Sequence, residues 1–181
     1  MTYIYKYNSP LGTITLASNG EALTGLWFDG QKYFGDTLSK EYKTQNLLIF
    51  NETIKWLDIY FSGKNPDFTP KMFIDASHFR RSVWEMLLAI PYGKIMTYGA
   101  IANKIAKQKG FKIMSAQAVG GAVEHNPISI IVPCHRVIGK NGSLTGYAGG
   151  IERKIKLLEL ERVDMSGLFV PKKGAVGERN I

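Results

Sequence analysis

The hydrophobic pattern of this chain changes its period near residue 47, and the change predicts a fold that combines a sheet with helices. Before that point, β-branched and aromatic residues concentrate in three short segments, as expected for strands, at residues 3–7, 13–17 and 23–28. Turn residues at 9–12 and an Asn-Gly pair at 19–20 separate them, which predicts hairpins and an antiparallel sheet. Beyond residue 47, most apolar residues recur every three or four positions, the spacing of helices.

A segment with two prolines follows the first expected helix and divides the chain. The helix is predicted over residues 47–61 by an apolar stripe of Leu47, Phe50, Ile54, Leu57 and Phe61. Gly63 is placed to end it, and Pro66 and Pro70 prevent its continuation. We therefore expect an N-terminal α/β structural unit over residues 1–75 and a mostly helical unit over residues 76–181. Together they predict an α+β fold.

Three helices are expected at the start of the second unit. Ser77, Thr97 and Ser115 are each positioned as an N-cap, because a Ser or Thr hydroxyl can accept a hydrogen bond from the first helical turn. The helices predicted after them run over about 78–90, 98–107 and 116–124. Gly110 breaks the chain between the last two, and two short helices around a glycine turn suggest a helix-turn-helix. Most helical hairpins do not bind DNA, so this pattern alone does not establish a DNA-binding protein.

The remaining chain is expected to deliver and then enclose one cysteine. Residues 128–132 are an apolar run that predicts a buried strand or extended segment leading to Cys134. A glycine-rich loop over 142–150 precedes a last helix over about 151–162. We expect the tail from Val163 to be loosely ordered.

The chain is basic and contains a single cysteine. It has 23 Lys and Arg against 15 Asp and Glu, a formal net charge of +8. This charge fits a nucleic-acid partner but also an ordinary soluble basic protein. One cysteine excludes an internal disulfide and a cysteine-rich zinc site, and three scattered histidines do not suggest a metal cluster. Without an apolar signal core or a membrane-length apolar run, we expect a cytoplasmic monomer that holds no metal.

The surroundings of Cys134 suggest reactivity but leave a second interpretation open. A lone cysteine is usually a small buried hydrophobe. Here Pro133 fixes the backbone before it, and His135 and Arg136 follow, and such neighbours favour a thiolate. On these residues alone, a reactive cysteine and a structural one remain comparable alternatives.

The segment 126–139, which contains Pro133-Cys134-His135-Arg136, resembles the active-site motif of the O6-alkylguanine-DNA alkyltransferases. Similar motifs lie on both sides, in the same order as in that family, at residues 79–84, 90–93, 97–102, 118–122, 146–150 and 154–161. The resemblance covers residues 78–162 closely and the first unit only loosely. Several ordered motifs together are specific, whereas any one of them is not.

The resemblance implies DNA repair by direct damage reversal. Double-stranded DNA is bound through its minor groove by the helix-turn-helix, and the O6-alkylguanine is flipped into a pocket, since its alkyl carbon is unreachable inside the stack. Cys134 attacks that carbon in one irreversible step, so each molecule acts once. No cofactor is implied. The range of alkyl groups, and whether O4-alkylthymine is also repaired, stay open.

The same resemblance assigns roles to four further side chains. It implies that His135 deprotonates Cys134 through a water, which requires either a bridging water or a turn at Cys134, because strand neighbours face opposite ways. Glu161 matches the glutamate that orients the histidine, although without the motif it would be a solvated charge. Asn126 matches the asparagine that ties the helix-turn-helix to the active-site strand. Tyr98 matches the tyrosine that donates a hydrogen bond to the leaving guanine.

A second set of residues is implied to bind the substrate and DNA. The backbone at Val137 and Ala148 would hold the base edges. Residues 147–150, among them Tyr147 and Gly149, would form the pocket wall, where glycines permit close approach. Many family members have a serine at Ala148. Many also have an arginine at Gln117, which here would act as a neutral wedge in the gap left by the flipped base. The set is completed by Ser115 and Arg136.

Two other functions are compatible with parts of the pattern. A cysteine hydrolase could use Cys134, His135 and Glu161, but no sequence feature marks an oxyanion hole or a peptide groove. A DNA-binding module without chemistry is the second, and Cys134 argues against it because relatives of that kind lack the cysteine.

Overall fold

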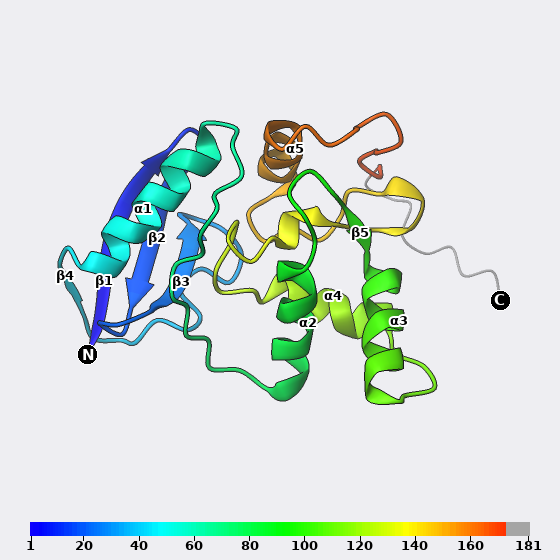
Figure 1. The fold of residues 1–181 in the computed structure, drawn as a ribbon, viewed down its shortest axis with the longest axis horizontal. Coiled ribbons are helices and arrows are strands. Elements are labelled where there is room, and N and C mark those ends of the chain that lie inside the picture. Colours follow the sequence, from blue (N-terminus) through cyan, green and yellow to red (C-terminus); the bar gives the residue numbers. More distant parts are fainter. Residues whose placement is uncertain (173–181) are drawn as a thin grey trace.

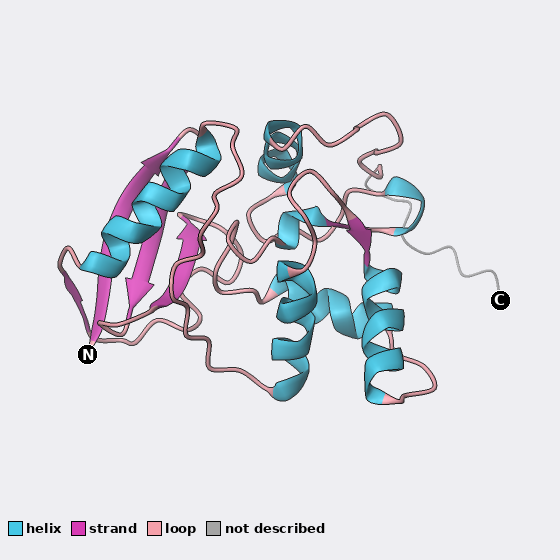
Figure 2. Cartoon of the chain, in the orientation of Figure 1, coloured by secondary structure: helices cyan, strands magenta, loops and turns pink. Residues whose placement is uncertain are grey.

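The structure is a computed structural model that describes residues 1–172, and it confirms an α+β fold (Figures 1 and 2). Four strands come first, in the spatial order β3-β2-β1-β4. The three predicted strands are present as an antiparallel meander: β1 (Thr2–Ser9), β2 (Gly12–Ser18) and β3 (Leu23–Phe28). The sheet is not wholly antiparallel, because β4 (Tyr42–Thr44) pairs in parallel with β1. The three residues of β4 are all exposed, so the sequence has no apolar alternation there that would predict a strand.

Helix α1 (Leu48–Phe61) lies against the sheet, as Figure 1 shows. Its buried face is rotated from the predicted stripe, since Ile54 and Phe61 are only half-buried. The side chains buried instead are Ile49, Phe50, Thr53, Trp56, Leu57 and Tyr60. Gly63 adopts a φ of 79° just beyond the helix, as predicted for its end. The rotation directs Tyr60 towards the second unit.

The helices of the second unit begin where their caps predict. The hydroxyls of Ser77, Thr97 and Ser115 each accept a hydrogen bond from a backbone N–H in the following turn. The helices are α2 (His78–Leu88), α3 (Tyr98–Lys109) and α4 (Ala116–Glu124). Gly110 ends α3 with a φ of 69°. The expected helix-turn-helix is therefore α3 and α4, and α2 packs against both.

Residues 128–132 do not form the predicted strand. Ile130 has a φ of 68°, and the Val132 N–H donates to the Ile128 carbonyl at 3.1 Å, so the segment is a buried turn. It pairs with β3 at one rung only, where the Ser129 N–H donates to the Leu26 carbonyl at 2.9 Å. The positive φ reverses the chain before a ladder can extend. The active-site segment is thus docked on an edge of the N-terminal sheet.

After that turn the chain enters a short 3₁₀ turn and a two-residue strand. The turn is η1 (Cys134–Arg136) and the strand is β6 (Val137–Ile138). Strand β6 pairs in parallel with β5 (Met96–Thr97), which directly precedes α3. This pair places the first residue of α3 beside the segment that carries the cysteine.

The last helix, α5 (Ile151–Leu160), follows a second 3₁₀ turn, η2 (Lys140–Gly142). The tail after it is more ordered than expected as far as residue 172. The Leu144 N–H donates to the Phe169 carbonyl at 2.8 Å, and Val163 is buried. Backbone pairing with the 142–144 loop supplies the order that composition did not suggest. Residues 173–181 of the predicted tail lie outside the described residues.

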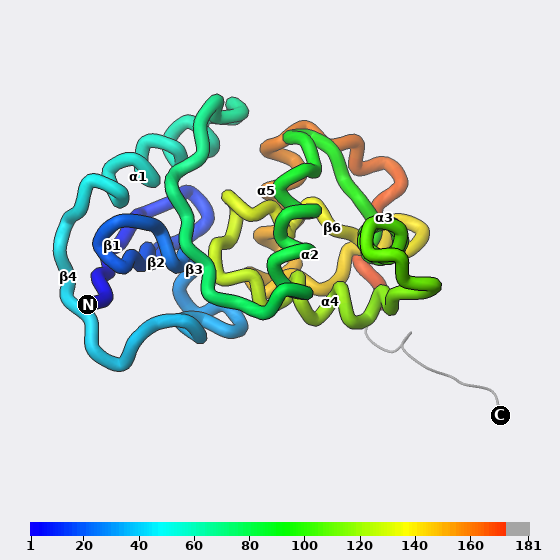
Figure 3. Tube along the Cα trace, turned by 60° about the horizontal axis from the view of Figure 1, so that its bottom comes forward, coloured from blue at the N-terminus to red at the C-terminus, as the bar shows by residue number. Residues whose placement is uncertain are grey.

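The sheet with α1 occupies one end of the molecule and helices α2 to α5 the other, and the segment between α1 and α2 crosses between them (Figure 3). One cluster of buried side chains nevertheless runs through both ends, from Leu26 of β3 to Val83 of α2 and Val119 of α4. The boundary near residue 75 stays a prediction. Among residues 1–172, no helix combines the length and apolar character needed to cross a membrane.

Candidate active site

Cys134 is the first residue of the η1 turn and is almost fully buried. Because the chain turns here instead of continuing as a strand, His135 is not forced to face away from it. A turn at Cys134 was one of the two ways in which His135 could act on the neighbouring cysteine. Both side chains lie in the shared core.

Glu161 is buried at the end of α5 and is not the solvated charge that local sequence alone would suggest. Its Oε1 lies 2.6 Å from His135 Nε2 and accepts from the Tyr60 hydroxyl at 2.7 Å. Its Oε2 accepts from Arg136 Nε at 2.8 Å and from the Gly93 N–H at 3.0 Å. Although burial raises the pKa of Glu161, its bonds to His135 and Arg136 lower it to about 2. The carboxyl is therefore ionised.

This carboxylate fixes the tautomer of His135. An ionised carboxylate only accepts hydrogen bonds, so the imidazole must carry its proton on Nε2, which faces Glu161 Oε1. Burial lowers the pKa of His135, against the opposing effect of Glu161, and keeps the ring neutral. Nδ1 is then an unprotonated acceptor, and it has no hydrogen-bond partner within residues 1–172. The ring thus offers a free basic nitrogen that is fully enclosed.

The sulfur of Cys134 is held by Asn126. Asn126 Nδ2 lies 3.1 Å from Cys134 Sγ and 2.8 Å from the Val132 carbonyl, while its Oδ1 accepts from the Ile128 N–H at 3.0 Å. One side chain thus connects the end of the helix-turn-helix, the buried turn and the thiol. Burial raises the pKa of Cys134, and the bond from Asn126 and the charge of Lys154 only partly offset this. Burial therefore outweighs the neighbouring groups that favour a thiolate, and the resting group is a thiol.

Lys154 on α5 is a buried cation that the sequence analysis did not assign. Its ammonium has no solvent exposure and donates to the carbonyls of Val137 and Thr145. Burial lowers the pKa of Lys154 to about 8, although the nearby Cys134 opposes this shift. It joins the segment after the cysteine to the loop of the predicted pocket wall. The signal was present, because Lys154 lies on the apolar face of its helix, three and four residues before Leu157 and Leu158.

Tyr98, the first residue of α3, reaches the same loop. Its hydroxyl is shared between the carbonyls of Thr145 and Gly146, at 3.2 Å from each. Burial raises the pKa of Tyr98, so the phenol keeps its proton and remains a donor. Gly146 has a φ of 67°, and a Cβ there would lie 2.6 Å from the tyrosine oxygen. The glycine therefore makes room for Tyr98.

A groove of about 500 Å³ lies between α3 and α4. Its lining brings together two predicted site residues, Tyr98 and Gln117, with small residues from both helices: Gly99, Ala116 and Gly120. Gln117 is exposed in the first turn of α4, where Ser115 caps the helix. The volume is within the range of small-molecule sites. Cys134 does not line this groove and lies deeper in the core.

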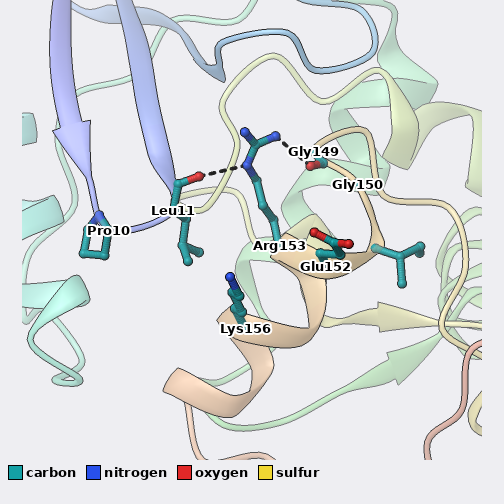
Figure 4. A pocket seen from close by; sticks show the side chains of 8 residues that line it. Pro10, Leu11, Gly149, Gly150, Glu152, Arg153 and Lys156 are labelled. Carbon is teal, nitrogen blue, oxygen red and sulfur yellow. Dashed lines mark hydrogen bonds between the residues drawn. The ribbon is translucent and has the colours of Figure 1, made fainter.

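The predicted pocket wall, residues 147–150, is supported from behind by the N-terminal unit. The Ala148 carbonyl accepts from the Lys32 N–H at 3.0 Å. Arg153 donates to the carbonyls of Gly149 and Leu11, at 3.0 Å each, and so bridges the loop to the β1–β2 turn (Figure 4). Tyr147 is buried, and its hydroxyl has no partner within residues 1–172.

The predicted binding residues Val137 and Arg136 are buried as well. The side chain of Val137 is fully enclosed, which leaves only its backbone to meet a base. Arg136 does not lie on a DNA-binding surface as expected. Its guanidinium is buried, with two bonds to Glu161 and one to the Ile90 carbonyl at 2.6 Å. We therefore no longer assign DNA contact to this side chain.

Sequence reasoning also missed two groups that complete the Glu161 site. Tyr60 comes from α1 and Gly93 from the turn after α2, and both donate to the carboxylate. Gly93 has a φ of 75° and offers a backbone N–H that no side-chain pattern reveals. The sequence would have indicated Tyr60 only if the buried face of α1 had been predicted correctly.

The fold thus combines a helix-turn-helix with a buried cysteine beside a buried histidine, and comparisons with known proteins show which family has this combination. Residues 78–163 match the family model described as 6-O-methylguanine DNA methyltransferase, DNA binding domain. Residues 2–72 match its ribonuclease-like domain. This chain belongs to the 6-O-methylguanine DNA methyltransferase family.

Individual relatives cover nearly the whole chain. The methylated-DNA--protein-cysteine methyltransferase of Mycobacterium tuberculosis (strain H37Rv) is 43% identical over 162 residues, which are 90% of this chain and 93% of the relative. The Methanosarcina acetivorans protein of the same name is 42% identical over 160 residues, 88% of this chain and 97% of the relative.

Solved structures from M. tuberculosis share the fold. The crystal structure of its O6-methylguanine methyltransferase has a TM-score of 0.76 at 42% identity, covering 90% of this chain and 93% of that one. The M. tuberculosis protein in complex with DNA has the same TM-score and identity, covering 88% and 92%.

Proposed function

We propose that this chain repairs DNA by transferring the alkyl group of O6-alkylguanine to Cys134. The observation that carries the proposal is the buried base behind the cysteine: a neutral His135 with a free Nδ1, oriented by an ionised Glu161. A nucleophile, a base and a third group behind the base form the arrangement that activates weak nucleophiles. In a member of this family, the activity is alkyl transfer from DNA to protein.

The transfer is a single displacement. The Cys134 proton passes to His135 Nδ1, directly or through one water, and Glu161 stabilises the imidazolium that results. The sulfur attacks the alkyl carbon, a carbon–sulfur bond forms, and the carbon–oxygen bond to guanine breaks. The guanine leaves with the electron pair of that bond and then takes up a proton. The thioether has no leaving group that would restore the thiol, so each molecule acts once.

Neighbouring groups support each part of this step. Asn126 holds the sulfur in place through its 3.1 Å contact. Lys154 brings a desolvated positive charge to the thiolate as it forms. Tyr98 stabilises the departing base, and it must exchange its long bonds to Thr145 and Gly146 for one to a guanine ring nitrogen. Bonds of 3.2 Å shared between two carbonyls are weak enough to be replaced.

DNA is bound by the α3–α4 surface. The first turn of α4 exposes only small side chains around Gln117, namely Ala116 and Ala118. Small residues let a helix approach closely, which suits a minor groove about 6 Å wide. Gln117 enters the gap that the flipped base leaves, and the base lies against the 147–150 loop with Val137 and Ala148 presenting backbone groups.

The N-terminal unit, residues 1–75 in our proposed division, supports the pocket. Its Lys32 N–H and Leu11 carbonyl hold the loop over 147–150, and its Tyr60 binds Glu161. We place the protein in the cytoplasm, where a single cysteine stays reduced.

Mass spectrometry of the Cys134 peptide tests the proposal. After exposure of the protein to a duplex containing O6-methylguanine, this peptide should gain one methyl group, in proportion to the DNA supplied and to no more than one per chain. The control is the same duplex with unmodified guanine. A peptide that stays unmodified in folded, DNA-bound protein would refute the assignment.

A further inference from the structure

The turn between α3 and α4 exposes two large apolar side chains next to the recognition helix. Ile113 is 84% exposed and Phe111 is 54% exposed, although apolar groups of this size usually pack into the core. The two are separated by one residue in a six-residue turn, 110–115. In Figure 1 this turn lies on the side of the molecule away from the sheet. Neither side chain takes part in the site described above.

The segment that contains the turn carries positive charge and no acidic residue. Residues 86–123 contain five lysines and no Asp or Glu: Lys94, Lys104, Lys107, Lys109 and Lys112. Lys104, Lys107 and Lys112 are exposed, whereas Lys109 lies 2.6 Å from His78 Nε2. A surface that combines cations with apolar groups matches a partner with regular negative charge and an apolar component. Duplex DNA is such a partner, since its grooves are walled by sugars between the phosphates.

The turn is also continuous with the DNA-binding surface. Ser115 ends the turn and caps α4 through the N–H groups of Gln117 and Ala118. Every residue from Phe111 to Gln117 is therefore exposed except Met114, which is half-buried. DNA held against the first turn of α4 cannot be far from this segment.

We propose that the 110–115 turn is a second DNA contact, with Ile113 and Phe111 packed into the groove and Lys107 and Lys112 on its phosphates. Apolar side chains inserted at base steps help to bend and open a duplex. This contact would assist the extrusion of the damaged base at Gln117. The inference rests on the proposed function, because it extends the same DNA-binding surface.

The test compares the double variant Phe111→Ser/Ile113→Ser with Leu48→Ser. Leu48 is the matched control, since it is 87% exposed but lies on α1 in the N-terminal unit. Fluorescence anisotropy measures Kd for a duplex with O6-methylguanine. The double variant should bind roughly tenfold more weakly than the wild type, as expected for two apolar side chains left in water. Leu48→Ser should bind like the wild type.

Salt dependence separates the two parts of the contact. Removing apolar groups should leave the slope of log Kd against log salt as it is, whereas Lys107→Gln and Lys112→Gln should each lower it by about one. The ratio of the alkyl-transfer rate on duplex to that on free O6-benzylguanine should fall in the double variant. Damage to the buried centre would slow both reactions equally, so a change in this ratio reports on the DNA contact.

Two results would overturn the contact. The first is an unchanged Kd in the double variant; if that variant also loses self-association in sedimentation, the patch binds a second copy of the chain. The second is equal slowing on duplex and free base, which would mean that the turn supports the fold. If the wild type binds duplex but Cys134 never becomes alkylated, the proposed repair function is refuted, whereas the proposed DNA contact of the 110–115 turn still stands.

Discussion

The alkyl-accepting centre and the α3–α4 surface use charge in opposite ways. In the centre, Arg136, Glu161 and Lys154 are all buried, and each forms hydrogen bonds with fixed partners. On the surface, exposed lysines stand among residues 86–123, which include no acidic residue. Buried charges act at short range and are hardly screened, whereas exposed ones act over distance and weaken with salt. The protein thus separates activation of the thiol from attraction of DNA, and each can be perturbed alone.

The largest effect should come from Cys134→Ala. The variant should lose all alkyl transfer but keep its affinity for damaged duplex, because the α3–α4 surface is untouched. Transfer of radiolabelled methyl from DNA to protein, and Kd by anisotropy, measure the two properties. Residual methyl removal would show that another group is the acceptor.

Salt should distinguish the two regions in the wild type. If the exposed lysines make three or four phosphate contacts, duplex affinity should fall roughly 40- to 150-fold between about 50 and 200 mM salt. The reaction with free O6-benzylguanine should respond little, since the centre is buried. A flat duplex response would remove the lysines from DNA binding.

Glu161→Gln should slow alkylation of Cys134 by at least roughly tenfold, because the imidazolium of His135 loses its counter-charge. The pH–rate profile with free O6-benzylguanine should also move to higher pH, since a more basic medium is then needed to form the thiolate. Glu159→Gln is the matched control, an exposed glutamate two positions earlier on α5. An identical profile for both variants would leave Glu161 without a role in activation.

The same residue should affect acid stability. The pKa of Glu161 is about 2 in the fold against its ordinary value of 4.5, so the carboxylate stabilises the protein above pH 4.5. This contribution, about 3 kcal/mol, should be lost as the pH falls from 4.5 to 2. Urea unfolding over that range should show a smaller pH dependence for Glu161→Gln than for the wild type. Equal pH dependence would contradict the depressed pKa.

The smallest effect should be that of Gln117→Ala. A neutral hydrogen bond to the orphaned base contributes about 1 kcal/mol, so duplex repair should slow roughly fivefold. The rate with free O6-benzylguanine should respond much less, because a free base needs no flipping. Gln117→Arg should keep or improve duplex repair. Equal slowing of both substrates by Gln117→Ala would mean that Gln117 supports the pocket instead.

Features set by neighbours in sequence were predictable. The caps at Ser77, Thr97 and Ser115 start their helices where expected, because a cap bonds only to its own first turn. Of the two alternatives that the adjacency of Cys134 and His135 left open, a bridging water or a turn, the structure has the turn.

Features set by distant partners were not predictable. The positive φ of Ile130 contradicts the preference of a β-branched residue, and only docking against β3 accounts for it. Lys154 and Glu161 lie on the buried face of α5, where charges are costly unless partners arrive from elsewhere. The place of Lys154 on an apolar face is visible in the sequence, but the partners of the two charges come from η1, α1, β6 and Thr145, and no local pattern reveals those partners.

The bonds that complete the centre also set an order of events in folding. Tyr60 and Glu161 are 101 residues apart in sequence, and Leu11 and Arg153 are 142 apart. Contacts of such long range form late, since long loops must close first. During synthesis Cys134 emerges well before Glu161, and His135 then lacks the carboxylate that fixes its proton on Nε2. His135 is therefore oriented by its carboxylate only after α5 has packed against the segment that carries the cysteine.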